Sequence, residues 1–417
     1  MFDLIVVGGG AAGFFGAINA AKLNPNLKIL ILEKSNRLLT KVRVSGGGRC
    51  NVTHHCFEST ALSKHYPRGQ KQLKKMFREF QATDVENWFQ TRGIKLRTES
   101  DGRMFPVSDS SATIIECFLS EASRLKILIE KQVEVINIES QANGNYLVKT
   151  LNQKEYGAKK LLITTGGSPK LSSYEWLEKL GHQIIRPIPS LFTFNDRDKC
   201  FKDLMGVSVS EGQIQIAGTN FKEKGPILVT HWGLSGPAVI RLSAWAAEYL
   251  HEQKYSFTAL VNWIGDVSED ELRTFLSSQI QAHPKKTIVK DSQYKLPIRL
   301  WVRLCELAEI NEIKIWSEVS KRSLNKLIEN LIRCPFQIHG KTTFKEEFVT
   351  CGGVNLDDID TATMESKKKS GIYFAGEVLN IDGETGGFNF QSAWTTSFLA
   401  AKAIGKHTDK KTSETEV

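Results

Sequence analysis

The amino-acid sequence predicts a mixed α/β fold, and two observations predict this class. Short apolar, β-branched runs at Phe2–Val7, Lys28–Leu32 and Gly371–Ala375 end at glycine-rich or acidic turns, which is typical of parallel strands buried on both faces. From about Pro187, short alternating segments separated by turn residues indicate a small antiparallel β domain. The chain therefore combines a parallel sheet with an inserted β domain.

The first strand leads into a glycine-rich turn with the spacing G-x-G-x-x-G, and a helix is expected from Ala11 to about Leu23. The first glycine permits a tight turn, the second lets the backbone approach a pyrophosphate, and the third allows close helix–strand packing. The free N–H groups of the helix start favour an anion. The alternative is a glycine turn without a ligand. The predicted contacts are Gly8, Gly10, Ala11, Ala12 and Gly13.

The second strand ends at Glu33, 20 residues after Gly13. A carboxylate at this strand tip can accept hydrogen bonds from both hydroxyls of an adenosine ribose and repels a 2′-phosphate. NAD and FAD both satisfy this pattern. The motif lies at the start of a chain whose other half is also large, and a second glycine motif follows it. Both observations favour FAD over NAD. The predicted site also includes Lys34.

Residues 45–56 read SGGGRCNVTHHC and allow two interpretations. Cys50 and Cys56 are six positions apart, whereas redox pairs of flavin disulfide reductases are five apart; six helical residues rise about 9 Å, beyond the ~7 Å limit for a disulfide. A cofactor cradle is the favoured interpretation, because glycines admit a ligand and arginine and asparagine supply donors. Its predicted members are Lys41, Arg43, Gly47, Gly48, Arg49 and Asn51.

Further along the chain, three strands are expected to complete the site. Lys160–Thr165 precedes a third glycine turn, and Gln132–Ile136 is the strand whose backbone would meet an adenine. Gly371–Ala375 closes at an acidic turn, after which glycines open a helix over about 388–404. The candidates here are Val133, Thr165, Gly166, Gly376 and Glu377.

Several long motifs give the chain a recognisable pattern. It resembles the bacterial family of FAD-dependent oxidoreductases that contains aminoacetone oxidase and the 3-dehydro-bile-acid reductase. The motifs that carry the resemblance are GGGAAG, the EK dipeptide Glu33-Lys34, SGGGRCNVT (Ser45–Thr53), GRMFPVSDSSATII (Gly102–Ile115), TTGG (Thr164–Gly167), THWGLSGPAVIRLS (Thr230–Ser243) and the segment Cys351–Trp394.

The resemblance implies that the last turn holds the flavin end of FAD. Asp382 is then the ribityl partner, and the amides of Gly387, Phe388 and Asn389 face the N1–C2=O edge of the ring. A helix N-terminus there raises the flavin potential by stabilising negative charge. The alternative is an acidic surface loop. Two departures are that Asn380 replaces a usual aspartate and that Ser168–His182 lacks the family's GSTGDGY run, which weakens any role for that region in binding a nicotinamide dinucleotide.

The predicted architecture is a Rossmann-type, glutathione-reductase-like FAD-binding domain with an inserted antiparallel β-barrel-like domain and a further helical insertion. Gly206–Ser210 and Gln213–Gly218 read as separate strands of the barrel-like domain, and a helix is expected to open at Pro237. Ser268 and Glu271 form a capping box. The expected boundaries are 1–187 and 351–405 for the FAD domain, 188–263 and 334–350 for the β-barrel-like substrate domain, 264–333 for the helical insert and 406–417 for a disordered tail.

Composition narrows the function classes. The formal net charge is +9, with basic clusters at Lys64–Arg78 and Lys367–Lys369, which is either ordinary solvated surface or a face for an anionic partner. No window is apolar enough for a membrane helix, and the start resembles no signal peptide, so a cytoplasmic location is expected. Seven scattered cysteines without a CxxC motif favour neither a disulfide framework nor a metal site.

These observations predict an FAD-dependent oxidoreductase that transfers hydride between flavin N5 and a small organic substrate, of the amino-ketone or steroid-ketone type in the relatives. NAD(P)H or oxygen is the expected electron partner, and no catalytic residue stands out. His231 and Trp232 could line a pocket or merely fix a turn, and Arg103 could neutralise an acidic substrate or form a surface salt bridge. An RNA-acting flavoprotein that modifies bases, and a flavin-bound sensor without turnover, are the rival functions.

Overall fold

The computed structural model describes residues 1–342 and 349–406. The chain forms two compact units, one made of Met1–Pro189 and Lys345–Val417 and the other of Ser190–Phe344. The predicted class is confirmed: a Rossmann-type α/β unit carries an inserted antiparallel barrel and helices. Parts of the predicted segment 334–350 and most of the predicted tail lie outside the described residues.

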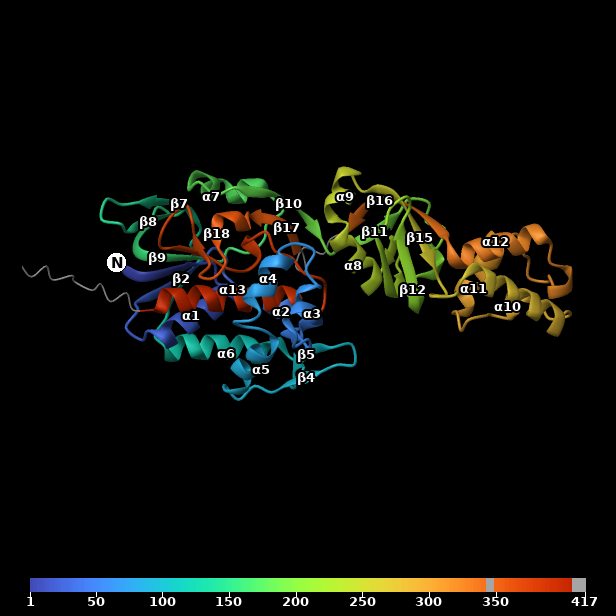
Figure 1. Cartoon of the computed structure of the whole chain (residues 1–417), viewed down its shortest axis with the longest axis horizontal. Helices are drawn as coiled ribbons and strands as arrows, with labels where there is room; N and C mark the ends of the chain where they lie inside the picture. Colours follow the sequence, from blue (N-terminus) through green and yellow to red (C-terminus); the bar gives the residue numbers. More distant parts are fainter. Residues whose placement is uncertain (343–348, 407–417) are drawn as a thin grey trace, which may run out of the picture. The chain divides into compact units, whose positions relative to one another are not determined.

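The first unit is built on a sheet with the strand order β18-β19-β20-β9-β1-β2-β6, extended by the antiparallel strands β7 and β8 beside β9 (Figure 1). Strands β20, β9, β1, β2 and β6 run parallel to one another, so their carboxyl ends share one edge. The strands are β1 (Phe2–Val7), β2 (Ile29–Glu33), β6 (Leu128–Lys131), β7 (Val135–Ser140), β8 (Tyr146–Thr150), β9 (Glu155–Ile163), β18 (Ile359–Asp360), β19 (Glu365–Ser366) and β20 (Ile372–Phe374).

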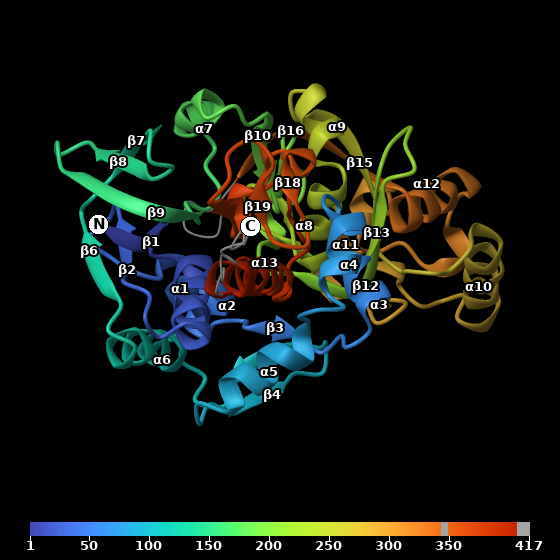
Figure 2. The ribbon, with the colours of Figure 1, turned by 60° about the vertical axis from the view of Figure 1, so that its left-hand side comes forward.

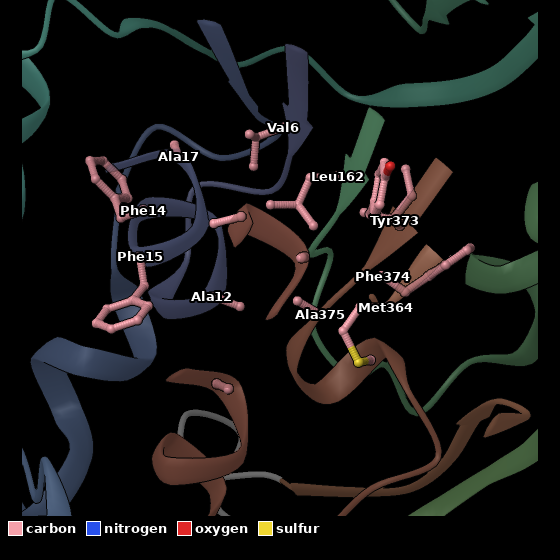
Figure 3. Close-up of a cluster of buried hydrophobic side chains, with 14 of the residues drawn as sticks. Val6, Ala12, Phe14, Phe15, Ala17, Leu162, Met364, Tyr373, Phe374 and Ala375 are labelled. Carbon is pink, nitrogen blue, oxygen red and sulfur yellow. The ribbon is translucent and has the colours of Figure 1, made fainter. Parts of the chain in front are cut away.

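Helices α1 (Ala11–Leu23) and α13 (Phe388–Gly405) lie side by side against this sheet (Figure 2). The Ser397 hydroxyl of α13 donates to the Ala12 carbonyl at 2.9 Å, and the rings of Phe15 and Trp394 are 5.2 Å apart. The close-up in Figure 3 shows apolar side chains from the strands and from α1 filling this core. The apolar runs of the sequence therefore bury the two faces of the parallel sheet.

The other elements of the first unit are two small sheets and several short helices. A small sheet has the order β3-β5-β4, and β10 pairs with β17. These elements are α2 (Thr40–Gly48), β3 (Thr53–His54), α3 (Ser59–Ser63), α4 (Gln70–Met76), α5 (Ala82–Gln90), β4 (Leu96–Thr98), β5 (Arg103–Pro106), α6 (Ser111–Arg124), α7 (Glu175–Lys179), β10 (Ile184–Ser190) and β17 (Val349–Val354).

The second unit contains a closed barrel with the strand order β11-β14-β13-β12-β15-β16. Helix α8 begins at Pro237 with Gly236 as its N-cap, and the Ser268–Glu271 capping box is present, as predicted. One hydrophobic cluster spans the barrel and the inserted helices. The elements are β11 (Thr193–Asp196), β12 (Ser208–Ile216), β13 (Lys222–Val229), β14 (Gly233–Ser235), α8 (Pro237–Trp245), α9 (Ala247–Glu252), β15 (Ser256–Asn262), α10 (Glu269–Ala282), α11 (Ile298–Leu307), α12 (Lys321–Ile332) and β16 (Cys334–Thr342).

Three predicted elements need correction. The two strands expected over 206–218 are one strand, β12, because a register shift between Val209 and Gly212 absorbs the glycine without ending the pairing. The strand expected at Gln132–Ile136 begins only at Val135, where pairing with β8 starts. Strand β17, partly assigned to the β domain, belongs to the first unit because it pairs with β10.

Candidate functional site

Three turns meet at the carboxyl edge of the parallel sheet. Val7 and Phe374 both align with Ile163, so β1, β9 and β20 end at the same level. The Thr164 amide donates to the Val7 carbonyl at 2.8 Å, and the Ala375 amide donates to the Ile163 carbonyl at 3.0 Å. The backbone thus joins the turns that follow the three strands, as expected for parallel strands that end together.

The glycines of the first turn serve two different purposes. A Cβ at Gly8 would lie 2.3 Å from the Thr164 carbonyl oxygen, and one at Gly13 would lie 2.0 Å from the Gly8 carbonyl oxygen. A Cβ at Gly10 would meet nothing within 4 Å. Gly8 and Gly13 are therefore required by packing, whereas the space beside Gly10 is open. No side chain caps α1, so its first amides remain available to an anion.

The carboxylate of Glu33 is fixed next to this turn. Its Oε2 accepts from the Gly9 amide and its Oε1 from the Ser35 amide, both at 2.8 Å. Each carboxylate oxygen keeps a further lone pair for a ribose hydroxyl. The Val133 amide donates to the Glu33 carbonyl at 2.9 Å, which places this predicted residue beside the strand tip. Lys34 is exposed.

A surface cavity of about 410 Å³ lies next to the ends of β2 and β6. Arg43, one of the predicted cofactor residues, lines it together with Arg37 and Lys131. Leu38, Ile115 and Leu119 also line it, so the cavity near the Glu33 side of the edge combines apolar walls with three cations.

The segment expected to be a loop cradle is the end of helix α2, which is distorted there. Gly46, Gly47 and Gly48 have φ angles of 58°, 68° and 86°, values that favour glycine. A Cβ at Gly47 would meet nothing within 4 Å, whereas one at Gly46 would lie 2.8 Å from the Phe105 ring. The open side of the cradle is therefore at Gly47 and Gly48, the two glycines that the sequence selected.

The two predicted arginines of this region contact carboxylates of the protein. Arg49 donates to Glu99 at 2.6 Å and lies over the Phe105 ring, 4.0 Å from its centre. Arg103 pairs with Asp101 at 2.7 Å and with Glu99 at 2.9 Å. Arg49 was expected to offer its guanidinium to a phosphate and Arg103 to a substrate. In the structure both belong to an ion-pair network around β4 and β5.

An ion pair between Lys41 and Glu377 connects the cradle to the turn that follows β20. Glu377 also accepts from the Thr350 amide at 2.9 Å. A Cβ at Gly167 would lie 2.5 Å from a Glu377 carboxylate oxygen, so the TTGG turn packs directly on this pair. At the preceding positions of the turn, Thr165 is exposed and a Cβ at Gly166 would meet nothing within 4 Å.

Two asparagines at this edge have acceptor oxygens without a hydrogen-bond partner among the described residues. These are the buried Oδ1 atoms of Asn51 and Asn380. A Cβ at Gly387 would lie 2.9 Å from Asn51 Oδ1, so Asn51 lies against the turn that opens α13. Buried polar atoms normally have a partner. Unsatisfied acceptors beside open glycine turns fit a bound group that carries hydroxyl and N–H donors.

Asp382, the predicted ribityl partner, is fully buried and paired with Arg68. Arg68 Nε donates to Asp382 Oδ1 at 2.6 Å, and the two residues also form an isolated antiparallel bridge. The carboxylate is therefore engaged by an arginine that local sequence reasoning did not select. Asn380, two positions earlier, has the unsatisfied acceptor. The sequence signal that could have identified this residue is that it stands where the family usually has aspartate.

The start of α13 has no side-chain cap, and its N-cap Gly387 has a φ angle of 95°. Tyr66 donates to the Phe388 carbonyl at 2.6 Å, and the Asn389 side chain closes the preceding loop by bonding the Gly383 amide and carbonyl, each at 2.9 Å. The predicted contacts Gly387, Phe388 and Asn389 thus form the N-terminus of α13, a position that stabilises negative charge.

Two histidines lie at this helix start. His54 and His65 both stack on the Phe388 ring, with ring centres 4.5 and 4.2 Å from it. His65 Nδ1 lies 2.9 Å from Glu384 Oε2, and His54 Nδ1 lies 3.0 Å from the Gly386 carbonyl. Burial lowers the pKa of His54. His65 and Glu384, which no sequence pattern indicated, form a hydrogen-bonded pair.

Neither Cys50 nor Cys56 is suited to thiolate chemistry. Both are free, Cys50 is buried, and burial raises its pKa to about 12. Burial also raises the pKa of Cys56. Thiolate nucleophiles need lowered pKa values, so neither thiol has the environment of a redox centre. Within residues 1–342 and 349–406, no group of three His, Cys, Asp or Glu side chains is placed to hold a metal ion.

His231 and Trp232 belong to the second unit, in the turn between β13 and β14. Their rings are 3.8 Å apart, and His231 is exposed. The Trp232 carbonyl accepts from the Asp196 amide at 2.8 Å, and the Thr230 amide bonds the Gly233 carbonyl at the same distance. These backbone contacts of Thr230 and Trp232 fix the turn before α8.

The comparison with protein families supplies the identification. Residues 2–403 match the family described as HI0933-like protein Rossmann domain. The chain belongs to this family. The protein is accordingly an FAD-dependent oxidoreductase, as the sequence predicted, and the three-turn edge is where its FAD-binding fold presents open glycines. Among the described residues, no helix is long and apolar enough to cross a membrane.

Individual relatives extend over nearly the whole chain. The ribosomal RNA dihydrouridine synthase of Escherichia coli K12 is 30% identical and covers 97% of this chain and 98% of the relative. The protein of the same name from Haemophilus influenzae is 29% identical, with coverages of 96% and 98%. The 3-dehydro-bile acid delta(4,6)-reductase of Clostridium scindens is 25% identical, also with 96% and 98%.

Solved structures agree on the fold. The 3-ketosteroid-delta4-(5alpha)-dehydrogenase of Rhodococcus jostii RHA1 superposes with a TM-score of 0.50 at 12% identity and covers 97% of each chain. At this identity the likeness shows the shared architecture of an FAD-binding unit with an inserted second unit, and nothing about the substrate.

Proposed function

We propose that this protein reduces a carbon–carbon double bond conjugated to a carbonyl group, and that its substrate is a uridine in ribosomal RNA. The observation that carries the proposal is the near-full-length similarity to two ribosomal RNA dihydrouridine synthases, at 30% and 29% identity. The formal charge of +9 supports a polyanionic substrate. The RNA-acting alternative is thus preferred over the small organic substrate.

The reaction adds one hydride and one proton across the C5=C6 bond of uracil, which gives 5,6-dihydrouracil. FAD, when bound and reduced, supplies the hydride and its two electrons. The direction of the reaction requires an electron donor, and we propose NADPH or NADH in this role rather than oxygen. The remaining proton must come from the protein or from solvent.

Different residues at the sheet edge would bind the cofactor and supply the proton. The open glycine turns at Gly10 and Gly47 let the cofactor approach the backbone, and the unsatisfied acceptors of Asn51 and Asn380 are available to its donors. We propose His65 as the proton donor, because its Nδ1 contacts Glu384 and its side chain is 36% exposed. An imidazole is the side chain that most often transfers a proton in enzymes, and exposure admits a substrate.

The second candidate is a steroid-type enone, and the 25% identity to the bile acid reductase favours it specifically. The two candidates share the same chemistry, because both substrates contain a double bond conjugated to a carbonyl. They differ in the group that must be bound: a polyanionic chain in one case and an apolar ring system in the other. Electrostatics therefore distinguishes them, since only the RNA complex weakens steeply with salt.

The test uses the purified holoprotein under anaerobic conditions. The flavin is first reduced with NADPH, and ribosomal RNA from cells that lack this protein is then added, with RNA from cells that contain it as the control. We expect the visible flavin band to return and dihydrouridine to be detected by mass spectrometry only with the former RNA. Reoxidation by a steroid enone, without dihydrouridine formation from RNA, would overturn the assignment in favour of the second candidate.

A further inference from the structure

A strongly basic segment lies beside the candidate flavin end of the site. Residues 64–78 read KHYPRGQKQLKKMFR and include the short helix α4. Leu73, Met76 and Phe77 are buried, so the apolar side of the segment packs on the protein. Arg68 pairs with the buried Asp382, and the other lysine and arginine side chains lie outward. The basic segment is defined here by the side chains of Lys64, Lys71, Lys74, Lys75 and Arg78, all exposed except Lys74, which is half-buried.

The positive charge of the basic segment is not neutralised locally. Among the described residues, no carboxylate lies within 4.0 Å of the cationic nitrogens of these five side chains. The nearby carboxylates have other partners. Glu58 accepts from the Thr60 and Ala61 amides at 2.8 and 2.6 Å, and Glu79 pairs with Lys402 at 2.8 Å. The charge of Lys74 acts on Glu58. The segment therefore presents the four positive charges of Lys64, Lys71, Lys75 and Arg78 to solvent.

The basic segment is anchored to the loop that precedes α13. The Glu384 amide donates to the His65 carbonyl at 2.9 Å, and Tyr66 donates to the Phe388 carbonyl at 2.6 Å. Arg68 pairs with the buried Asp382. Helix α4 begins two residues after this last contact and lies against α13 (Figure 1). An anion bound along α4 is consequently held next to residues 382–388.

We infer that the basic segment binds the phosphate backbone of the RNA and carries one nucleotide toward the loop at 382–388. This inference rests on the proposed function and names the surface through which that substrate is held. Lysines are point charges on flexible stems and suit a continuous polyanion better than a single fixed phosphate. A membrane-binding helix would expose its apolar face, whereas here no large apolar side chain between positions 64 and 78 is exposed.

The expected effect follows from counterion release. Each phosphate contact to a single strand contributes about 0.7 to the slope of log K against log salt concentration. Loss of two lysines should therefore reduce the slope by about 1.4. At moderate salt, where each contact is worth about a factor of three to ten in affinity, the dissociation constant should rise by roughly 10-fold to 100-fold.

The experiment compares two double variants of the holoprotein. K71Q/K75Q removes two exposed charges one turn apart on α4, and the matched control K126Q/K179Q removes two exposed lysines elsewhere in the first unit. Binding of a labelled single-stranded oligouridylate is measured by fluorescence anisotropy across a salt series. FAD content and melting temperature are recorded for all proteins and should not change.

Weaker binding and a smaller salt slope in K71Q/K75Q only would support the inference. Equal losses in both variants, or none in K71Q/K75Q, would overturn it even where the wild type forms dihydrouridine. Equally tight binding of poly-glutamate would also overturn it, because the surface would then accept an acidic protein. If K71Q/K75Q loses RNA binding but the wild type forms no dihydrouridine, the docking surface stands and the proposed reaction fails.

Discussion

Replacing Asp382 by Asn removes a negative charge that the fold buries completely. The Asp382 side chain is fully buried and that of its partner Arg68 is 10% exposed. Arg68 donates to both carboxylate oxygens, and the Nε bond is 2.6 Å long. The variant leaves the guanidinium buried opposite a neutral amide. The residue that the sequence assigned to the cofactor should thus act chiefly on stability.

The magnitude follows from the geometry of the pair. Removing one partner of a buried ion pair costs about 3–5 kcal/mol. For a unit of this size, 1 kcal/mol corresponds to a change of about 2–4 °C in melting temperature, so the first unit should melt roughly 6–20 °C lower. The control Asp101→Asn breaks a pair with Arg103 whose side chains are 53% and 37% exposed. The control substitution should lower the free energy of unfolding by about 0.2–1 kcal/mol.

The assay is thermal unfolding of the apoprotein, followed by FAD titration of each variant below its melting temperature. Asp382→Asn should lower the melting temperature without FAD, and the double variant R68M/D382L should recover part of the loss because it removes both buried charges. The reasoning is refuted if Asp382→Asn melts like the wild type but no longer binds FAD, since the carboxylate would then act on the cofactor directly.

Four further outcomes are expected. Gly13→Ala should purify without visible flavin absorbance, because its Cβ would lie 2.0 Å from the Gly8 carbonyl oxygen; a fully yellow protein would contradict this. Asn380→Leu should weaken FAD binding about 10-fold, the loss of one hydrogen bond, while the apoprotein melts no lower than wild type. Burial lowers the pKa of His182, so its imidazole stays neutral in the folded state, whereas in the unfolded chain it protonates near the ordinary pKa of 6.5. The melting temperature should therefore decrease as the pH is lowered below 6.5, and this decrease should be smaller in His182→Gln. His65→Gln should slow dihydrouridine formation about 100-fold or more while leaving RNA affinity within about twofold; an unchanged rate would exclude His65 as the proton donor.

Local sequence patterns were sufficient where the physics is local. The turn after β1, the start of α8 at Pro237 and the Ser268–Glu271 capping box depend on residues a few positions apart, and the structure shows each of them. The shared edge of the parallel strands followed from the same patterns, because apolar runs that end in glycines are typical of strands sharing a ligand-binding edge.

The sequence could not predict contacts between residues that are far apart in the chain. Arg49 and Asp382 carry the right chemistry for a cofactor, but Glu99 lies 50 positions from the former and Arg68 lies 314 positions from the latter. No local pattern reveals that a buried arginine will take the carboxylate. The kink at the end of α2 was likewise missed, since three left-handed glycines can end a helix as well as form a loop.

The loop NIDGE at 380–384 shows how these two kinds of information combine. Its two carboxylates, Asp382 and Glu384, contact Arg68 and His65, which belong to one short stretch of chain before α4. Asn380, on the same loop, is left with an unsatisfied buried acceptor. The acidic residues therefore fix the loop to the basic segment, and the neutral one is available to a ligand. Because the same contacts position the loop and α4, a polyanion on α4 and a cofactor at the loop would be held close together, and proximity of this kind serves the proposed reaction on one base of a long RNA.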